Sequence, residues 1–202
     1  MDDIIYFSAS DAVERKFEEH LSGIGAVDFM GQVSFFLGKE FQRTHHEDGH
    51  LTVHLMQQSF AENLIESLGF DYLSTSMFIT PYHSGLPIDS VIHEAMPTTE
   101  RDALCLAYQS IVGRLNWLAH TTRPDLATVV LLLAWHQSNP SMGHMKAARY
   151  ATKYLAHTKT LGIYFTSMKR VKLESFLHFP LPSNKLLPMS DANWGPQDAS
   201  QL

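Results

Sequence analysis

The sequence predicts an α+β fold in which a small sheet with a hairpin is followed by a helical bundle and then by terminal strands. Runs of β-branched and aromatic residues, separated by turn residues, occur among the first 56 positions, a pattern typical of strands. Between residues 98 and 160, apolar residues recur at helical spacing instead. Apolar residues make up 45% of the chain, which is enough for a packed core.

The N-terminal region predicts a strand and then a helix. Residues 2–7 (DDIIYF) are rich in strand-forming Ile, Tyr and Phe. Asp11 is expected to cap the helix that follows, with Glu14 completing a capping box, and Gly23 and Gly25 mark its end. The buried stripe of this helix is expected to repeat every four residues, at Val13, Phe17 and Leu21.

A hairpin and a second helix are expected next. Residues 33–41 and 50–56 predict the two strands of the hairpin, with an Asp-Gly turn signal between them. Ser59 is expected to cap the second helix and Gly69 to close it. Residues 71–97 contain several prolines without clear periodicity, which indicates a connecting segment.

Three helices and two strands complete the prediction. The first helix spans about residues 99–120, the second runs from a capping Thr122 to residue 139, and the third begins near Ser141. Residues 162–165 and 186–191 predict strands. The apolar stripe of the first of these helices consists of Leu104, Ile111, Leu115 and Leu118.

The charge of the chain is unevenly distributed. The net charge is −6, which by itself argues against a nucleic-acid partner. Residues 1–100 hold 4 Lys or Arg and 16 Asp or Glu, a net −12, whereas residues 101–172 hold 10 and 2, a net +8. A basic segment in an acidic chain is either an electrostatic footprint for phosphates or a solvated helix face.

Several classes of protein are excluded at this level. The single cysteine, Cys105, excludes an internal disulfide and a cysteine-based zinc site. No apolar run approaches the roughly 18 residues of a membrane span, and the acidic N-terminus lacks the basic region of a signal peptide. These features predict a protein that is not secreted, has no membrane partner and occupies a reducing compartment.

The adjacent carboxylates of Asp2 and Asp3 are the first candidate site. Oxygen ligands suit Mg²⁺, and two such ions can activate an attacking hydroxyl and stabilise a leaving oxygen. Taken alone, an Asp-Asp pair at a chain start is a frayed acidic end in about nine cases of ten.

The order of the motifs resembles the reverse transcriptase of Copia-type retrotransposons. Asp2 and Asp3, an amphipathic helix and then residues 35–41 (FFLGKEF) follow one another as in that family, whose catalytic motif is Tyr-Val-Asp-Asp. Met1 stands where the family has Val. The resemblance implies a partial palm sheet in which Asp2 and Asp3 bind Mg²⁺ and catalyse nucleotidyl transfer in the intact enzyme.

The hairpin is the second point of resemblance. In the polymerase family this element is the primer grip, which holds the 3′ end of the primer against the metals, where a misplacement of about 1 Å can cost roughly 100-fold in rate. The resemblance implies that Phe36, Leu37 and Gly38 contact nucleic acid near its tip. The alternative is an ordinary hairpin with Gly38 at a bulge or a close approach.

The third point of resemblance is the segment 111–118 (IVGRLNWL), which is similar to the first thumb helix of retroviral enzymes. There, the Gly and the Trp lie in the minor groove of the template–primer. A glycine within a helix costs about 1 kcal/mol relative to alanine, so close backbone approach would explain it. The expected nucleic-acid face, spaced i, i+4, i+7 and i+8, consists of Gln109, Gly113, Asn116 and Trp117.

An alternative for this helix is packing of a neighbouring helix against Gly113 with Trp117 in the core. The next segment, 122–126 (TRPDL), also resembles the Copia pattern. Its Arg123 and Asp125 are expected to form a local ion pair and not to contact substrate.

The fourth point of resemblance is residues 190–195 (SDANWG), which are similar to the first strand of the Copia RNase H domain. Asp191 would be the first metal-binding carboxylate of that domain, whose remaining acidic residues are absent. Among the twelve histidines, residues such as His50 and His54 would lie about 13 Å apart along a strand, too far for one ion.

The resemblance divides the chain into four regions and implies its function. Residues 1–56 would be palm with the hairpin, 57–97 a helix and connector, 98–160 a helical thumb-like region, and 161–202 a truncated RNase H-like start. The intact enzyme would act on an RNA or DNA template–primer and dNTP in a cytoplasmic virus-like particle or the nucleus. The missing fingers–palm segment of the polyprotein would be a partner. The alternative is an inactive remnant that binds only nucleic acid or protein.

Overall fold

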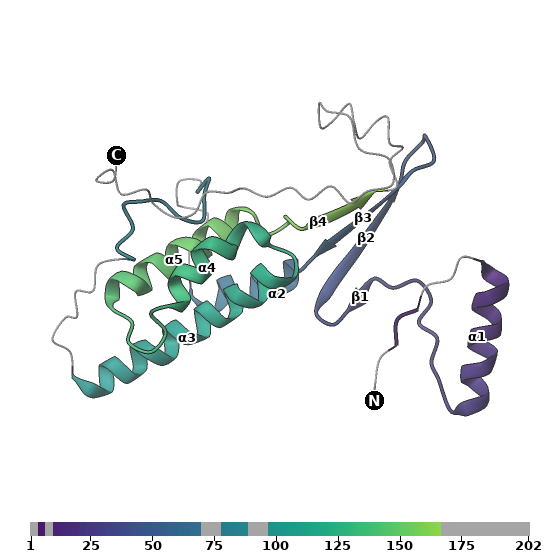
Figure 1. The fold of residues 1–202 in the computed structure, drawn as a ribbon, viewed down its shortest axis with the longest axis horizontal. Coiled ribbons are helices and arrows are strands. Elements are labelled where there is room, and N and C mark those ends of the chain that lie inside the picture. Colours follow the sequence, from purple (N-terminus) through teal and green to yellow (C-terminus); the bar gives the residue numbers. More distant parts are fainter. Residues whose placement is uncertain (1–3, 7–9, 70–77, 89–96, 167–202) are drawn as a thin grey trace, which may run out of the picture.

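The protein is an α+β chain with a four-stranded antiparallel sheet and a bundle of helices. The structure, a computed structural model, describes residues 4–6, 10–69, 78–88 and 97–166. Figure 1 shows the bundle at one side, the sheet projecting from it, and the first helix apart from both. The predicted fold class is confirmed at this level.

The sheet consists of β1 (Phe35–Phe36), β2 (Lys39–His45), β3 (Leu51–Met56) and β4 (Ile163–Thr166), in that order and antiparallel throughout. The strand predicted at residues 162–165 therefore pairs with the hairpin, because the chain returns to β3 after the helical bundle (Figure 1). Gly162 permits this return, since a Cβ built there would lie 2.2 Å from the Leu55 carbonyl oxygen.

The hairpin differs from the prediction in one respect. Residues 33–41 were expected to form one strand, but the chain reverses at Leu37 and Gly38, so that Phe36 pairs with Lys39. The prediction of a single strand there is wrong. The predicted β2–β3 hairpin is confirmed, and its loop contains Gly49 at φ +82°, a left-handed conformation that favours glycine.

The first helix, α1 (Asp11–Ile24), lies apart from the bundle in Figure 1. Its N-cap is Ser10 and not Asp11, and no side-chain capping hydrogen bond forms among the described residues there. The expected buried stripe is also wrong: none of the side chains of α1, all of them described, is buried. Val13 is 59% exposed and Phe17 37% exposed. Its predicted C-terminal glycine, Gly25, is confirmed as the C-cap.

The strand expected at residues 2–7 is not formed by the described residues 4–6. Instead Tyr6 lies against α1, with its ring centroid 4.9 Å from that of Phe17. The Tyr6 hydroxyl donates a hydrogen bond of 2.5 Å to Glu18. This bond to a carboxylate raises the pKa of Tyr6 to about 12, because the neutral phenol is the donor.

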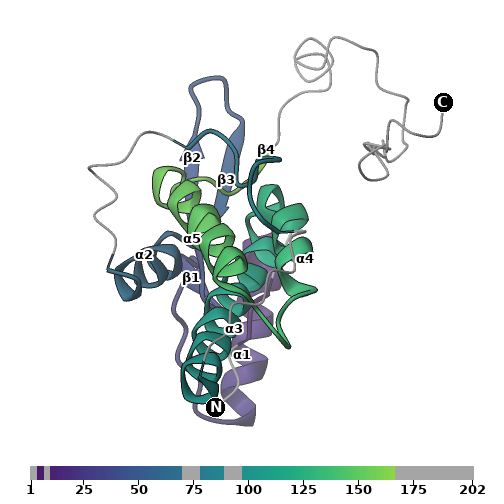
Figure 2. The same ribbon diagram turned by 90° about the vertical axis from the view of Figure 1, so that its left-hand side faces the viewer.

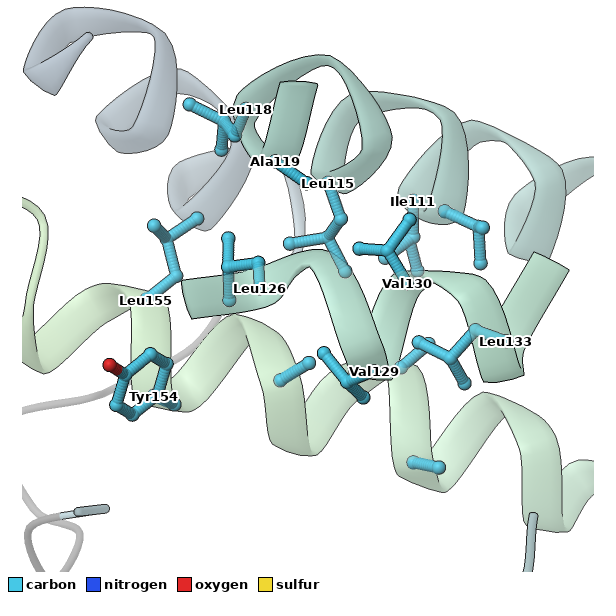
Figure 3. Packing of buried hydrophobic residues seen from close by; sticks show 14 of the residues in the cluster. Ile111, Leu115, Leu118, Ala119, Leu126, Val129, Val130, Leu133, Tyr154 and Leu155 are labelled. Carbon is cyan, nitrogen blue, oxygen red and sulfur yellow. The ribbon is translucent and has the colours of Figure 1, made fainter. Parts of the chain in front are cut away.

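The bundle contains α2 (Gln58–Ser67), α3 (Thr98–Thr121), the 3₁₀ turn η2 (Pro124–Leu126), α4 (Ala127–Ala134) and α5 (Met142–His157). Figure 2 shows α5 between α2 and α4, with α3 running below α5. Figure 3 shows how their apolar faces meet, which is the main favourable contribution to folding. The fully buried residues at the centre include Leu115, Leu118, Leu126, Val129, Leu133 and Leu155.

The helix ends confirm some predicted caps and correct others. The predicted start of the third helix near Ser141 is confirmed: Ser141 is the N-cap of α5, and His144 completes a capping box with it. Gln57, not Ser59, is the N-cap of α2, while Gly69 follows the helix at φ +62° as predicted. Thr122 is not the N-cap of the second predicted helix, because it is the C-cap of α3 and its hydroxyl donates to Gln57. The second predicted helix also ends earlier than residue 139, because α4 stops at Ala134.

An ion pair at η2, whose arginine is buried and whose aspartate is partly exposed, connects η2 with the end of α5. The Arg123 guanidinium, 2% exposed, donates two hydrogen bonds of 2.9 and 2.7 Å to Asp125, which confirms the predicted local pair. It also donates to the carbonyl and hydroxyl of Thr158 just beyond α5. The Tyr154 hydroxyl donates to Asp125 at 2.8 Å. Burial acts to raise the pKa of Asp125, but the hydrogen bonds and charge of Arg123 outweigh it, so that this pKa is lowered.

A second buried polar group, His54, lies on the central strand β3. It is 8% exposed and stacks on Tyr164 of β4, with ring centroids 4.0 Å apart. Its buried Nε2 has no hydrogen-bond partner among the described residues. Burial therefore lowers the pKa of His54, because the charged imidazolium would be poorly solvated.

Replacing Arg123 by Met is expected to lower the free energy of unfolding by about 1–3 kcal/mol, because the Thr158 carbonyl oxygen and the partly exposed Asp125 lose their buried donor. Lys159→Met is the matched control. It breaks a partly exposed ion pair with Glu62, which is expected to cost less than about 1 kcal/mol. Urea denaturation of both variants measures the difference, and equal losses would contradict the structural role given to Arg123.

The free energy of unfolding is expected to decrease as the pH falls below about 6.5, the pKa of an unfolded histidine. The unfolded chain then binds a proton at His54 that the folded chain binds only at lower pH, so protonation favours unfolding. His54→Phe keeps a ring against Tyr164 and is expected to reduce this dependence. Denaturation at pH 5 and 7 measures it, and an unchanged difference would show that His54 does not cause it.

Candidate nucleic-acid interface

The tip of the β1–β2 hairpin is a two-residue turn in a left-handed conformation. Leu37 has φ +48° and Gly38 has φ +74°, as a type I′ turn requires at both positions. Glycine adopts this conformation freely, whereas for Leu it costs about 1 kcal/mol. The strained Leu37 side chain is 64% exposed and that of Phe35 is 61% exposed. The tip therefore presents apolar side chains to solvent at an energetic cost, which is a feature of binding sites.

Two polar contacts fix this hairpin to the bundle. The Glu40 carboxylate on β2 accepts a hydrogen bond of 2.8 Å from the Ser59 amide in the first turn of α2, where a negative charge is favourable. Gln57, 2% exposed between β3 and α2, accepts hydrogen bonds from the hydroxyls of Thr121 and Thr122 at the end of α3. The hairpin therefore keeps a defined position relative to α3.

The predicted nucleic-acid face of α3 is open to solvent. Gln109, Gly113, Asn116 and Trp117 are all exposed, Trp117 by 43%. No heavy atom in the described part of the chain lies within 4 Å of a Cβ built on Gly113, apart from the backbone of α3 itself. The alternative, with a helix packed on Gly113 and Trp117 in the core, is therefore wrong for the described residues. Helix packing does not explain this glycine.

The hairpin and α3 meet at Lys39 and Trp117. The Lys39 ammonium, one residue after Gly38, lies 5.2 Å from the centroid of the Trp117 ring, within the range of a cation–π interaction. Two of the predicted elements thus lie side by side although they are far apart in the sequence. Lys39 was not among the residues predicted for this site. The signal available for it was a basic residue directly after the turn glycine.

Of the other residues predicted on this face of α3, Gln109 lies far from Trp117, whereas Gly113 and Asn116 lie close to it. Gln109 donates a hydrogen bond of 2.9 Å to the Gln137 carbonyl beyond α4, and it lies about 12 Å along the helix from Trp117 at the usual rise. The structure therefore does not bring Gln109 to the hairpin. Gly113, Asn116 and Trp117 lie within little more than one turn and form the part of the face nearest to it.

The basic residues of the helical region are only partly on this face. Arg114, next to Gly113, donates to the Ser67 hydroxyl at the end of α2 at 2.9 Å. Arg123 is neutralised by Asp125, and Lys159 pairs with Glu62. The basic residues of the helical region therefore do not form one phosphate-binding surface, because Lys146, Arg149 and Lys153 lie on a different helix, α5.

The predicted metal ligands Asp2, Asp3 and Asp191 lie outside the described residues. Within the described ranges, no group of three His, Cys, Asp or Glu side chains could hold a metal ion. The histidines of the β2–β3 loop make other contacts, since His46 stacks on His50 with centroids 3.8 Å apart. The helices of the described part are all too short or too polar to cross a membrane.

Comparison with known proteins relates the chain to a transposon protein. It is 26% identical over 173 residues, 86% of its length, to the putative transposon Ty5-1 protein of Saccharomyces cerevisiae. It is also 34% identical over 87 residues, 43% of its length, to the secreted RxLR effector protein 161 of Plasmopara viticola. The chain spans 52% of the length of each. No family model and no solved structure matches it.

Replacing Leu37 by Asn is expected to raise the free energy of unfolding by about 1 kcal/mol, because Asn-Gly suits a type I′ turn better than Leu-Gly. Gly38→Ala is the matched opposite change at the neighbouring position. It forces a Cβ into the left-handed region and is expected to lower the free energy of unfolding by a similar amount. Urea denaturation measures both. A loss of stability in Leu37→Asn would contradict the strain assigned to this turn.

Proposed function

We propose that the chain is a fragment of the RNA-directed DNA polymerase of a Copia-type retrotransposon, in which the hairpin tip and α3 hold a template–primer duplex. The ordered motifs support this proposal, and so does the similarity to a transposon protein. The observation that carries it is the contact between Lys39 and Trp117, since it joins two elements to which the resemblance separately assigns contacts with nucleic acid.

Each part of this surface has a different role in the proposed binding. Gly113 lets the backbone of α3 approach a groove closely, because it has no Cβ. The exposed Trp117 ring provides an apolar surface beside it, and Lys39 supplies positive charge to the phosphates. The apolar tip at Leu37 would contact the sugar and base edges of the primer end.

The chemistry of the intact enzyme would come from Mg²⁺, which activates the primer 3′-hydroxyl and stabilises the leaving pyrophosphate. The resemblance assigns this metal to Asp2 and Asp3, which lie outside the described residues. The role proposed for the described residues is therefore to hold and position the duplex. This chain alone is expected not to extend a primer, which a primer-extension assay with Mg²⁺ measures.

A module that only binds nucleic acid, as an inactive remnant, is the second candidate function. The exposed face of α3 supports this second function as well as it supports the polymerase fragment, because binding nucleic acid needs no metal. Mixing with a fingers–palm fragment separates the two candidates. Recovery of primer extension supports the polymerase fragment, while duplex binding without any recovery supports the remnant.

Replacing Gly113 by Ala is expected to stabilise the protein and weaken its binding to an RNA–DNA hybrid. The added methyl group meets open space in the free protein, so the free energy of unfolding should rise by about 0.5–1 kcal/mol. In the complex it would meet the duplex at a cost of about 1–3 kcal/mol, which corresponds to roughly 5- to 150-fold weaker binding. Fluorescence anisotropy with a labelled hybrid measures the affinity.

Gly23→Ala in α1 is the matched control, because that helical glycine also has no described heavy atom within 4 Å of a built Cβ. It should stabilise the chain without changing binding. Affinity should fall steeply as the salt concentration rises, since phosphate contacts release counterions. Unchanged binding in Gly113→Ala, or no binding at low salt, would contradict the proposed interface.

A further inference from the structure

One face of the four-stranded sheet is apolar but is not buried. Directly opposed residues of antiparallel strands point to the same face, so the registers define this apolar sheet face from three strands. Two rows across β2, β3 and β4 form its centre, Phe41–Leu55–Ile163 and Arg43–Val53–Phe165. None of these six residues is buried or belongs to the core of the bundle, and Phe165 is 57% exposed. An apolar sheet face normally packs on another element.

Helix α1 has an apolar stripe that is also not buried. Val13, Phe17, Leu21 and Ile24 are spaced so that they lie on one side of the helix. None of the four is buried, and Ile24 is 73% exposed. Tyr6 covers only part of Phe17. A helix of 14 residues is marginal in water by itself, so this stripe is expected to need a partner surface.

The charges of these two surfaces are complementary. Lys39 and Arg43 are the residues of the apolar sheet face that are charged at neutral pH, because Glu40, the one acidic residue in the four strands, points to the other side and binds α2. Arg43 donates to the Val33 carbonyl oxygen, which carries no full charge. Helix α1 instead has four acidic and two basic residues, a net −2. Such complementarity favours association of the right surfaces.

The two surfaces also match in size. Helix α1 has 14 residues and is therefore about 21 Å long. Strand β3 at the centre of the sheet has six residues and is about 20 Å long. The apolar stripe can therefore lie along the whole of the apolar sheet face.

The connection between α1 and the sheet favours the sheet of a second copy. Residues 25–34 form no helix or strand, and Figure 1 shows α1 held apart from the sheet of its own chain. Val27, Phe29 and Met30 in this connection are exposed, Met30 by 91%. An extended connection lets a helix reach another copy, and exchange of an identical element is a low-cost route to dimers.

We propose that the chain forms a symmetric dimer in which the apolar stripe of α1 from each copy packs on the apolar sheet face of the other copy. Each copy gives one helix and receives one, so the arrangement is closed and cannot extend into a fibre. Both apolar surfaces of both copies are then removed from water. The dimer does not require nucleic acid and is independent of the proposed function.

Sedimentation velocity of the full chain tests the oligomeric state. At a concentration of about 100 µM, well above the dissociation constant of a moderately stable dimer, the mass should be twice that of the 22.8-kDa chain. Dilution should return the monomer. A monomer at every concentration would overturn the proposal, whether α1 then packs on its own sheet or stays free.

Two variants act on the two sides of the contact. Phe17→Glu on α1 and Phe165→Glu on the sheet should each give a monomer, because each places a carboxylate in an apolar interface. The matched controls are Ala12→Glu on the other side of α1 and Thr166→Glu on the other face of β4, both at exposed positions. Both controls should remain dimeric. Loss of the dimer in only one phenylalanine variant would indicate contact between identical elements and overturn the proposal, as would its loss in a control.

A mixture of the two phenylalanine variants tests the exchange itself. Phe17→Glu keeps an intact sheet face and Phe165→Glu keeps an intact helix, so a mixed dimer has one of its two contacts. An equimolar mixture at about 100 µM should therefore contain a dimer that neither variant forms alone. A mixture that stays monomeric would overturn the proposal.

Hydrogen exchange of the unaltered chain decides the matter if a variant does not fold, as judged by circular dichroism. Protection of the amides of α1 and of the sheet should increase together as the concentration is raised from about 1 to about 100 µM. Protection that does not depend on concentration would overturn the proposal, because it would show that neither surface is covered by a second copy.

Discussion

The position of the hairpin relative to the bundle depends on Gln57. This side chain is almost fully buried between β3 and α2, and its carbonyl oxygen accepts hydrogen bonds from two threonine hydroxyls at the end of α3. Its amide nitrogen has no partner among the described residues, which costs about 1–3 kcal/mol. The Thr121 hydroxyl oxygen also lies 2.7 Å from the Trp117 carbonyl oxygen, so its single proton is shared between Gln57 and Trp117. A buried amide thus connects the sheet, the helix end and the exposed tryptophan.

The helical bundle could be predicted from the sequence, because α3 and α5 have long apolar stripes and clear end signals. The turn at Leu37 was missed, since Leu-Gly lacks the Asn-Gly or Asp-Gly signature and lies within an apolar run. The burial of Phe17 was wrongly expected, because an amphipathic pattern does not say whether a partner surface exists. The pairing of β4 with β3 joins residues more than a hundred positions apart, which no local pattern reveals.

The candidate site was predictable in its parts but not in its assembly. The spacing of Gly113 and Trp117 correctly predicts a shared helix face, and the structure leaves that face open to solvent. Lys39 could not be assigned to it, because its position depends on Gln57 and on the turn. The local pair of Arg123 with Asp125 was predicted, whereas its distant partner Thr158 was not, since that contact depends on how α5 packs.

A double-mutant cycle on Lys39 and Trp117 tests most directly whether the hairpin and α3 form one nucleic-acid surface. Affinities for an RNA–DNA hybrid would be measured for Lys39→Gln, Trp117→Leu and the double variant at low salt. If the two side chains act together, their effects should differ from additivity by about 0.5–1 kcal/mol. Full additivity, or affinities equal to that of the unaltered chain, would contradict a shared surface.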